Sequence, residues 1–455
     1  MTRKLFGTDG VRGVAGELLS AELALGLAQA ATDLTRTERP RVLIVRDTRE
    51  SGEMLQAAIA AGVAAAGGEA LLGGVLPTPA APLLIARYGF DLAVVLSASH
   101  NPYRDNGIKF FGGDGYKLSD DTELEIEREL ERAADRTATG AATAARRRSG
   151  DGPPPRIGRI RELRGAGEDY LRELHTRFAG LDLTGLDVLL DCANGATHRV
   201  APEVFRRLGA NVTAVADTPD GRNINADCGS THVEQLTERV LAGGHALGFA
   251  FDGDGDRVLA VDGAGVVVDG DELMALAALH LHDTGRLRGE GVVVTVMTNY
   301  GFHTAMAEAG IEVASAKVGD RYVLEELLAR DWTLGGEQSG HLIELGFNRT
   351  GDGIAGALLT LEALAGADLR ERHAIAKLPQ RLVNVRVHDR EALQRSESVT
   401  AAIRAEDEAL AGRGRVLVRA SGTEPLVRVM VEAPTDAEAR EVCDRLVALV
   451  QRELG

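Results

Sequence analysis

The chain has 455 residues, a length that suits three to four domains of about 100 to 150 residues, each able to bury a core. Its 44% hydrophobic and 26% charged residues are ordinary for a globular protein, and its net charge of −17 argues against a general nucleic-acid-binding surface. This charge does not exclude a small anionic substrate, because local arginines decide such binding.

The cysteines and the N-terminus favour a cytoplasmic protein. Cys192, Cys228 and Cys443 are odd in number and far apart, so they form neither a disulfide framework nor a CxxC metal site, which indicates a reducing compartment. Residues 1–10 contain no apolar signal region, and no apolar run approaches the ~20 residues that a membrane span needs.

Apolar strand-like runs alternate with helical segments in the first part of the chain. Such alternation predicts a mostly parallel sheet covered on both faces, with ligands at the carboxyl ends of strands. The expected order is a strand at 41–46, an alanine-rich helix that Ser51 caps and Gly67-Gly68 ends, a strand at 70–75, a helix at 78–88, a strand at 91–96 and a helix at 121–134.

The loop after the third strand carries candidate catalytic groups. It reads Ser97-Ala98-Ser99-His100-Asn101-Pro102, and Lys109 lies ten positions beyond Ser99. A serine beside a histidine at a strand end, with a lysine ten positions on, has the parts of an activated nucleophile and a proton carrier. In an extended chain His100 points away from Ser99, so it need not be the base. The competing interpretation is a turn whose serine hydroxyl caps a backbone group.

A second and a third unit repeat the pattern after a linker. The segment 137–155 is rich in alanine, arginine and proline, and we expect a surface loop there, with Arg146-Arg147-Arg148 solvated. The expected helices are 168–178, 198–208, 233–242, 273–282, 302–309, 322–329 and 351–365, and the expected strands are 186–190, 212–216, 246–251, 258–261, 292–297 and 313–316.

The loop Asp252-Gly253-Asp254-Gly255-Asp256-Arg257 predicts a metal site. Three carboxylates at every second position can converge on one side of a loop, and oxygen ligands suit Mg²⁺ or Ca²⁺. An EF-hand is excluded, since Arg257 stands where that loop needs glycine and Gly263 where it needs glutamate. The alternative is a solvated acidic turn, but like charges at a buried strand's end repel unless something neutralises them.

Two later loops carry candidate binding groups. In Gly335-Gly336-Glu337-Gln338-Ser339-Gly340-His341 the glycines would let Glu337 and Ser339 face a polyol, although this segment alone favours a plain hairpin turn. Strands at 382–388, 415–419 and 426–432 with helices at 391–411 and 436–453 predict a smaller α+β domain. Its loop offers donors for a phosphate, unless it is a simple ribbon turn: Arg419, Ser421, Gly422, Thr423 and Arg428.

Together these segments resemble one family. The segment Phe6-Gly7-Thr8-Asp9-Gly10-Val11-Arg12-Gly13 and the loops 97–102, 252–257, 336–341 and 419–425 resemble, in this order, the α-D-phosphohexomutases. The resemblance runs from residue 6 to beyond residue 428, nearly the whole chain. The N-terminal segment, the loop 336–341 and Val318-Gly319-Asp320-Arg321 are similar to the branch that acts on amino-sugar phosphates.

The resemblance implies an α/β fold in which three similar domains with mixed or parallel sheets and a smaller C-terminal α+β domain surround a central active-site cleft. The expected domains are residues 1–160, 161–262, 263–376 and 377–455. The boundary within 137–165 is the least defined, because the linker is long and irregular.

The resemblance also implies an intramolecular phosphotransferase that interconverts glucosamine 6-phosphate and glucosamine 1-phosphate for amino-sugar and cell-wall precursors. The route would pass through phosphoserine at Ser99 and a glucosamine 1,6-bisphosphate intermediate. One Mg²⁺ would be held by that phosphate with Asp252, Asp254 and Asp256. The expected catalytic residues are Ser99, His100, Lys109, Arg12 and Arg257, and the expected substrate-binding residues are Glu337, Ser339, His341, Arg419, Ser421, Gly422, Thr423 and Arg428.

Other functions compete with this interpretation. A phosphomannomutase or phosphoglucomutase of the same family differs only at the sugar's position 2, and no physical argument makes the loop 336–341 select an amine there. A non-catalytic metal- and phosphate-binding module and a phosphatase are alternatives from other classes. The expected partner is a small sugar phosphate, without nucleic acid or membrane, and a homodimer stays open.

Overall fold

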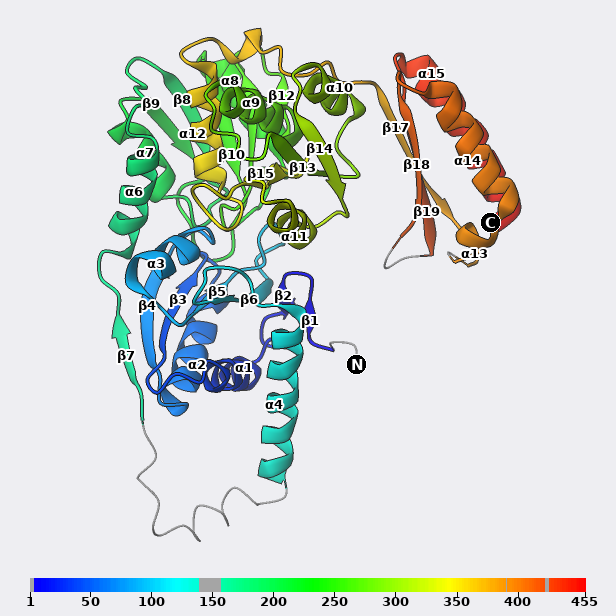
Figure 1. Cartoon of the computed structure of the whole chain (residues 1–455). Helices are drawn as coiled ribbons and strands as arrows, with labels where there is room; N and C mark the ends of the chain where they lie inside the picture. The colour runs from blue at the N-terminus through cyan, green and yellow to red at the C-terminus, as the bar shows by residue number, and fades with distance from the viewer. Residues whose placement is uncertain (1–3, 139–156, 390, 422–424) are drawn as a thin grey trace. The chain divides into compact units, whose positions relative to one another are not determined.

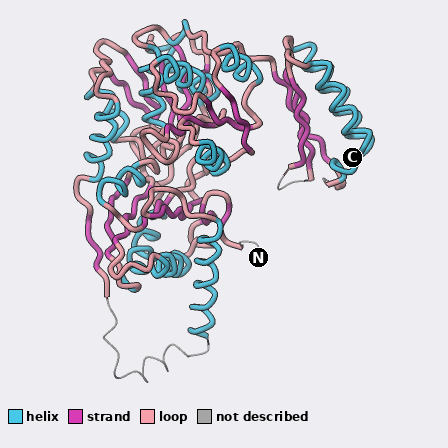
Figure 2. The backbone as a smooth tube through the Cα atoms, viewed as in Figure 1, coloured by secondary structure: helices cyan, strands magenta, loops and turns pink. Residues whose placement is uncertain are grey.

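The computed structural model describes residues 4–138, 157–389, 391–421 and 425–455 (Figure 1). The chain forms two compact units, Met1–Val296 with Ala314–Arg372, and Met297–Val313 with His373–Gly455. In each unit helices accompany the strands, which are magenta in Figure 2. Most of the expected linker at 137–155, with its three arginines, lies outside the described residues.

A seven-stranded sheet forms the first part of the larger unit. Its elements are β1 (Phe6–Gly7), β2 (Gly10–Val14), α1 (Ala21–Leu34), β3 (Arg41–Arg46), α2 (Ser51–Ala65), β4 (Glu69–Val75), α3 (Ala80–Tyr88), β5 (Leu92–Leu96), β6 (Asp105–Gly112), α4 (Asp120–Ala138) and β7 (Arg159–Glu162). The strand order is β1-β2-β6-β5-β3-β4-β7. β3 pairs in parallel with β4 and β5, whereas β6 pairs antiparallel with β5 and β2, so the sheet is mixed.

The local sequence explains most of these elements. The apolar run of β3 is buried as expected, and Gly67 ends the turn after α2 with a φ of 86°. Ser51 does not cap α2, because it is the first helical residue and its hydroxyl accepts a hydrogen bond from Asn106 Nδ2 at 2.9 Å. β6 was not predicted as a strand, since its first three residues, Asp105, Asn106 and Gly107, are of turn-forming types.

Two further sheets complete the larger unit, apart from Glu312 and Val313 at the start of β14. Their elements are α6 (Ala166–Arg177), β8 (Asp187–Asp191), α7 (Val200–Arg207), β9 (Asn211–Val215), α8 (Val233–Gly243), β10 (Leu247–Phe251), β11 (Val258–Asp262), β12 (Val267–Val268), α9 (Gly270–Asp283), β13 (Gly291–Thr295), β14 (Glu312–Ala316), α11 (Asp320–Arg330), β15 (Leu334–Gly336), β16 (Leu342–Glu344), α12 (Gly353–Leu364) and the 3₁₀ helix Leu369–Glu371. The strand orders are β12-β11-β10-β8-β9 and β14-β13-β15-β16. In both sheets a parallel pair, β10 with β8 and β13 with β15, continues into an antiparallel neighbour.

The smaller unit is an α+β domain with an antiparallel sheet in the order β17-β19-β18. Its elements are α10 (Tyr300–Glu308), β17 (Gln380–Arg386), α13 (Ala392–Arg395), α14 (Glu397–Leu410), β18 (Arg415–Ala420), β19 (Leu426–Glu432) and α15 (Asp436–Leu454). The single helix expected at 391–411 is wrong, because Ser396 leaves the helical conformation with ψ at 102° and caps α14 through the amide of Val399.

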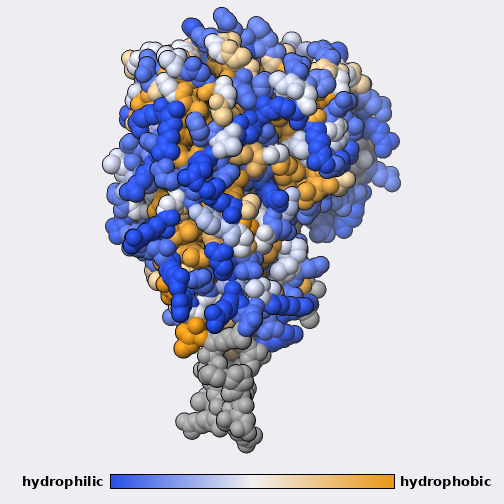
Figure 3. Space-filling model, turned by 60° about the vertical axis from the view of Figure 1, so that its left-hand side comes forward, coloured by the Kyte–Doolittle hydropathy of each residue, from blue (hydrophilic) through white to orange (hydrophobic). Residues whose placement is uncertain are grey.

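A bilayer sets requirements for the helices and the surface of a protein that crosses it. Among the described residues, no helix is long and apolar enough to cross a membrane. On the face drawn in Figure 3, hydrophobic side chains are interspersed with hydrophilic ones. Such scattered apolar exposure is normal for globular proteins.

A buried carboxyl group joins α6 to α12. Asp352 caps α12 by accepting a hydrogen bond from Ala355 N at 3.0 Å, and it also accepts one from the hydroxyl of Tyr170 on α6 at 2.9 Å. Burial raises the pKa of Asp352 to about 6. Between the ordinary pKa of an aspartate and this raised pKa, Asp352 is therefore mainly neutral in the native protein and mainly ionised in the unfolded chain.

We predict that, as pH rises, the free energy of unfolding of Asp352→Asn increases relative to that of wild type. Between about pH 4 and pH 7 the unfolded wild-type chain loses a proton that the native state retains, which costs wild type up to about 3 kcal/mol. Urea unfolding of both proteins across this range measures the difference. Asp283→Asn, at the exposed end of α9, is the control. Parallel stability curves for D352N and wild type would contradict the prediction.

Candidate active site

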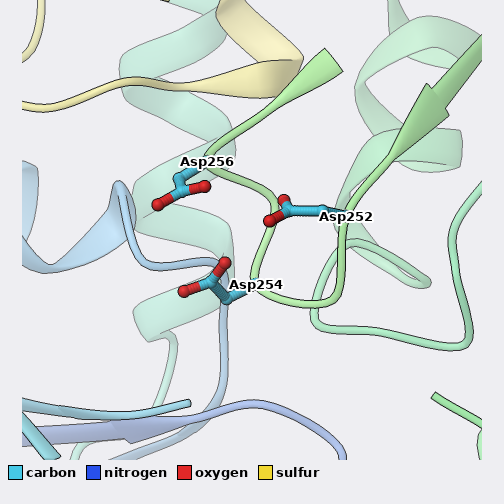
Figure 4. Close-up of side chains that lie close together, drawn as sticks. All are labelled: Asp252, Asp254 and Asp256. Carbon is cyan, nitrogen blue, oxygen red and sulfur yellow. The ribbon is translucent and has the colours of Figure 1, made fainter. Parts of the chain in front are cut away.

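Three aspartates project from the loop between β10 and β11 toward one region (Figure 4). Asp252, Asp254 and Asp256 are only 1%, 1% and 4% exposed, and one ligand oxygen from each lies within 4.8 Å of the others. The alternative of a solvated turn is therefore wrong. One oxygen each of Asp254 and Asp256 is buried without a hydrogen-bond partner, which suits a cation ligand. These residues could hold a hard metal ion.

Electrostatics in this acidic loop favour an added positive charge. Burial, together with repulsion from Asp256 and Asp254, raises the pKa of Asp252. Burial also acts to raise the pKa of Asp256, but His341 and neighbouring cations outweigh it and lower that pKa. The three carboxylates are thus only partly compensated by the protein, and a divalent ion would supply the missing charge.

Backbone contacts fix the acidic loop. A Cβ at Gly253 would lie 2.5 Å from the carbonyl oxygen of Ser99, so only glycine allows this close approach. On the other side, Thr78 donates to Asp254 twice, from its amide to the carbonyl at 2.8 Å and from its hydroxyl to Oδ2 at 2.6 Å. The acidic loop of the second sheet is therefore held by two segments that follow strands β4 and β5 of the first sheet.

Ser99 lies directly against this loop. It is 1% exposed, and its hydroxyl donates a hydrogen bond to Asp252 Oδ2. Its φ of 52° is left-handed, which costs a non-glycine residue about 1–2 kcal/mol. An extended chain would point His100 away from Ser99, and this expectation is wrong. Because of the turn, His100 Nδ1 lies 3.4 Å from Ser99 Oγ. The serine is thus presented by a constrained conformation.

Lys109 lies on β6, paired with Val95 of β5, and reaches the same loop. Its ammonium group is 2.9 Å from Asp254 Oδ2 and 3.0 Å from Asp9 Oδ2. Burial acts to lower the pKa of Lys109, but the two aspartates outweigh it and raise that pKa. Lys109 therefore carries its proton at neutral pH.

A chain of alternating charges extends from this lysine to the third sheet. Asp9, between β1 and β2, also contacts Arg12 and Lys117, and Lys117 contacts Asp320 at the start of α11. Sequence reasoning missed Lys117, which stands in no motif. Asp9 and Asp320 belong to segments that carried the resemblance, but no charge pairing could be inferred from them.

The cavity beside Ser99 has a volume of about 370 Å³ and contains many of the expected residues. Arg12 and Arg257 line it, and the Nε atom of each is buried without a hydrogen-bond partner. Arg257 also approaches His100, with 3.3 Å between Nη1 and Nδ1. The cavity therefore offers guanidinium donors to an anion next to the serine.

The predicted sugar loop is the hairpin turn between β15 and β16, and it reaches this cavity. Glu337 lines the cavity and accepts a hydrogen bond from Gly319 N at 2.9 Å. His341 lines it too, and its Nε2 accepts from Gly351 N at 3.1 Å, which leaves the Nδ1 proton facing Asp256 at 3.7 Å. Ser339 is exposed and is not among the residues that line this cavity.

The predicted phosphate loop lies in the smaller unit. Arg419 of β18 and Arg428 of β19 pair directly across the sheet, and burial together with Arg428 lowers the pKa of Arg419. Ser421 is buried, and its amide donates to Leu426 O at 2.8 Å. Gly422 and Thr423 lie outside the described residues. These two adjacent arginines repel each other across the strands and could together bind an anion.

A carboxylate cluster that could hold a metal ion, next to a serine hydroxyl and arginines, has the parts of an enzyme that transfers phosphoryl groups. Comparison with known proteins agrees with this class. The chain matches the models for phosphoglucomutase/phosphomannomutase alpha/beta/alpha domain I at residues 3–137, domain II at 168–265, domain III at 269–382 and the C-terminal domain at 382–449. The chain belongs to the phosphoglucomutase/phosphomannomutase family.

Individual relatives support this assignment. The chain is 50% identical over 454 residues to a phosphoglucosamine mutase of Moorella thermoacetica, with 99% of this chain and 98% of that protein covered. It also has the fold of a phosphoglucomutase/phosphomannomutase family protein of Burkholderia thailandensis, with a TM-score of 0.81 at 22% identity and 100% and 99% coverage. N-acetylphosphoglucosamine mutase of Aspergillus fumigatus, solved with GlcNAc-6P and magnesium, has a TM-score of 0.68 at 19% identity, with 99% and 96% coverage.

We predict that Lys117→Met destabilises the protein by about 3 kcal/mol, because it leaves the carboxylates of Asp9 and Asp320 facing each other without their shared cation. Urea unfolding measures the loss. Lys4→Met is the matched control, since Lys4 and its partner Glu131 are 75% and 60% exposed, and it should leave stability unchanged within error. Equal effects of the two substitutions would show that the buried charge chain does not stabilise the fold.

Proposed function

We propose that the chain interconverts glucosamine 6-phosphate and glucosamine 1-phosphate through a phosphorylated Ser99. The observation that carries this is that the Ser99 hydroxyl donates a hydrogen bond to Asp252, one of three aspartates that could hold a metal ion, beside a cavity lined by Arg12 and Arg257. The choice of an amino sugar rests on relatives named phosphoglucosamine mutase, 47–50% identical over nearly the full length. They make the alternative phosphomannomutase or phosphoglucomutase activity less favoured.

In the proposed reaction the free sugar hydroxyl attacks the phosphorus of phosphoserine 99. A new P–O bond forms as the bond to Ser99 Oγ breaks, and the hydroxyl proton is transferred so that Oγ regains one. The product is glucosamine 1,6-bisphosphate. The bisphosphate then reorients in the cavity. Its other phosphoryl group is transferred to Ser99 by the reverse of the first step, and the isomerised monophosphate leaves.

The acidic loop and the cations around it would support this transfer. We propose that Asp252, Asp254 and Asp256, with the Ser99 phosphate, hold one Mg²⁺, whose charge would offset that of the phosphoryl group. Arg12 and Arg257 would bind the equatorial oxygens, since both line the cavity.

Proton movement is proposed for two residues that contact the acidic loop or Ser99. Lys109, kept protonated by Asp254 and Asp9, would donate a proton, since it reaches the acidic loop that Ser99 also contacts. His100, 3.4 Å from Ser99 Oγ, is the second candidate, and burial with the nearby arginines lowers its pKa, which favours the neutral imidazole.

Substrate recognition is proposed to use two loops. Glu337, Ser339 and His341 would bind sugar hydroxyl or amine groups. The second loop, Arg419, Ser421, Gly422, Thr423 and Arg428, would bind the phosphate that is not reacting. The repulsion between Arg419 and Arg428 supports this role, because an anion between them would relieve it.

The remaining expectations stay proposals. We propose that the domains span residues 1–160, 161–262, 263–376 and 377–455, that the protein is cytoplasmic, and that it can form a homodimer. The cavity chemistry supports a small sugar phosphate as partner.

The purified protein with Mg²⁺ and glucosamine 1,6-bisphosphate should convert glucosamine 6-phosphate to the 1-phosphate, and peptide mapping should place one phosphate on Ser99. Ser99→Ala should lower kcat by roughly 10³-fold or more, because the nucleophile is lost. Ser398→Ala, on the exposed surface of α14, is the control. Faster turnover of mannose or glucose phosphates would overturn the amino-sugar assignment, and net phosphate release would indicate a phosphatase.

We predict that Asp254→Asn weakens Mg²⁺ binding by roughly 10-fold or more, because it removes one charged ligand from the buried set. Calorimetric titration of the unphosphorylated protein measures this without relying on activity. Asp187→Asn is the control, since Asp187 is exposed and lies at the start of β8, away from the carboxyl ends of the strands. Unchanged affinity in D254N would exclude the triad as the metal site.

A further inference from the structure

The backbone of the serine loop converges on one buried arginine. Arg49, between β3 and α2, is 0% exposed. Its Nη2 donates to the carbonyls of Ser99 and Asn101 at 3.0 and 2.8 Å, and its Nη1 donates to those of Pro102 and Asp105. Its Nε donates to Asp47 Oδ2 at 2.8 Å, so all five guanidinium N–H groups are used.

The amide of Ser99 is held from the same pair. It donates to Ser97 Oγ at 2.9 Å, and that hydroxyl donates to Asp47 Oδ2 at 2.6 Å. Asp47 is 1% exposed and also accepts from Arg49. Both peptide groups that flank the Cα atom of Ser99 are therefore tied, directly or through one hydroxyl, to the Asp47–Arg49 pair.

A third side chain reaches the same carbonyls from the second sheet. Asn225, in the segment between β9 and α8, donates from Nδ2 to the carbonyls of Ser99 and Asn101 at 2.9 and 3.1 Å. It is 7% exposed. Two carbonyl oxygens of the serine loop thus each accept from Arg49 and from Asn225, although these residues are 176 positions apart.

We propose that Arg49, supported by Asp47 and Asn225, is a positioning residue that holds Ser99 in its left-handed conformation. In that conformation Oγ reaches Asp252 and faces the cavity. This inference rests on the proposed function, because positioning matters only if Ser99 carries the phosphoryl group. An arginine that only formed an ion pair with Asp47 would not also need to donate four of its five N–H groups to carbonyl oxygens of one loop.

Arg49→Lys tests the proposal, because an ammonium group cannot reproduce the planar fork that reaches four carbonyls. We expect kcat per folded molecule to fall by roughly 10- to 100-fold, with KM changed by less than about 3-fold. The ³¹P NMR signal of phosphoserine 99 should shift or broaden. Arg372→Lys is the control, since Arg372 is another arginine held in ion pairs, here with Asp262 and Glu272, and it should change stability but neither kcat nor the phosphorus signal.

Asn225→Ala keeps the proposal testable if R49K does not fold. It removes one donor from each shared carbonyl and leaves Arg49 in place, and we expect kcat to fall by about 3- to 10-fold with the same phosphorus change. Lowered melting temperature with unchanged kcat and phosphorus signal in the folded variants would overturn the positioning role alone. If wild type shows neither turnover nor phosphate on Ser99, the proposed function and this inference both fail.

Discussion

Repulsion among the three buried carboxylates of one short loop sets the requirements for the surrounding structure. Asp252, Asp254 and Asp256 are nearly inaccessible to water, where unpaired charge is costly. Compensation comes from separate elements: Lys109 on β6, and His341 after β15. Because each cation must come close to its carboxylate, the electrostatic need also fixes how the three sheets of the larger unit meet.

The same strand arrangement positions three loops of the larger unit: the serine loop, the acidic loop and the predicted sugar loop. β5, β10 and β15 each pair in parallel with one neighbour, and each then turns into an antiparallel partner, β6, β11 or β16. The turn between these strands carries Ser99, the aspartates or Glu337. A hairpin at the carboxyl end of a parallel strand positions side chains at a defined place at the edge of the sheet, while both flanking strands stay buried. Repetition of this device explains how segments far apart in sequence supply one cavity.

Local patterns in the sequence predicted the longer apolar strands and the position of the acidic loop, but they missed β6 and short strands such as β1, β15 and β16. The run at 41–46 is apolar enough to identify β3, and alternating aspartate and glycine identifies the acidic loop. Features that depend on distant partners were not predictable: the left-handed turn at Ser99 has its carbonyl bound by Arg49, and Lys117 acquires its role only where α11 brings Asp320 beside it. The break between α13 and α14 at Ser396 was missed, because a single serine in a polar segment can lie within a helix as well as cap one.

The cationic side chains of the two units differ in how their charges are compensated. In the larger unit the cations Lys109 and Lys117 are each bound to two carboxylates, so their charges are already compensated inside the protein. In the smaller unit Arg419 and Arg428 stand opposite each other on adjacent strands, where like charges destabilise the sheet. A conformation that carries such repulsion gains most from binding an anion, whereas the lysines of the larger unit gain little. We therefore expect phosphate affinity to come from arginines, with the lysines mainly maintaining the shape and charge balance around Ser99.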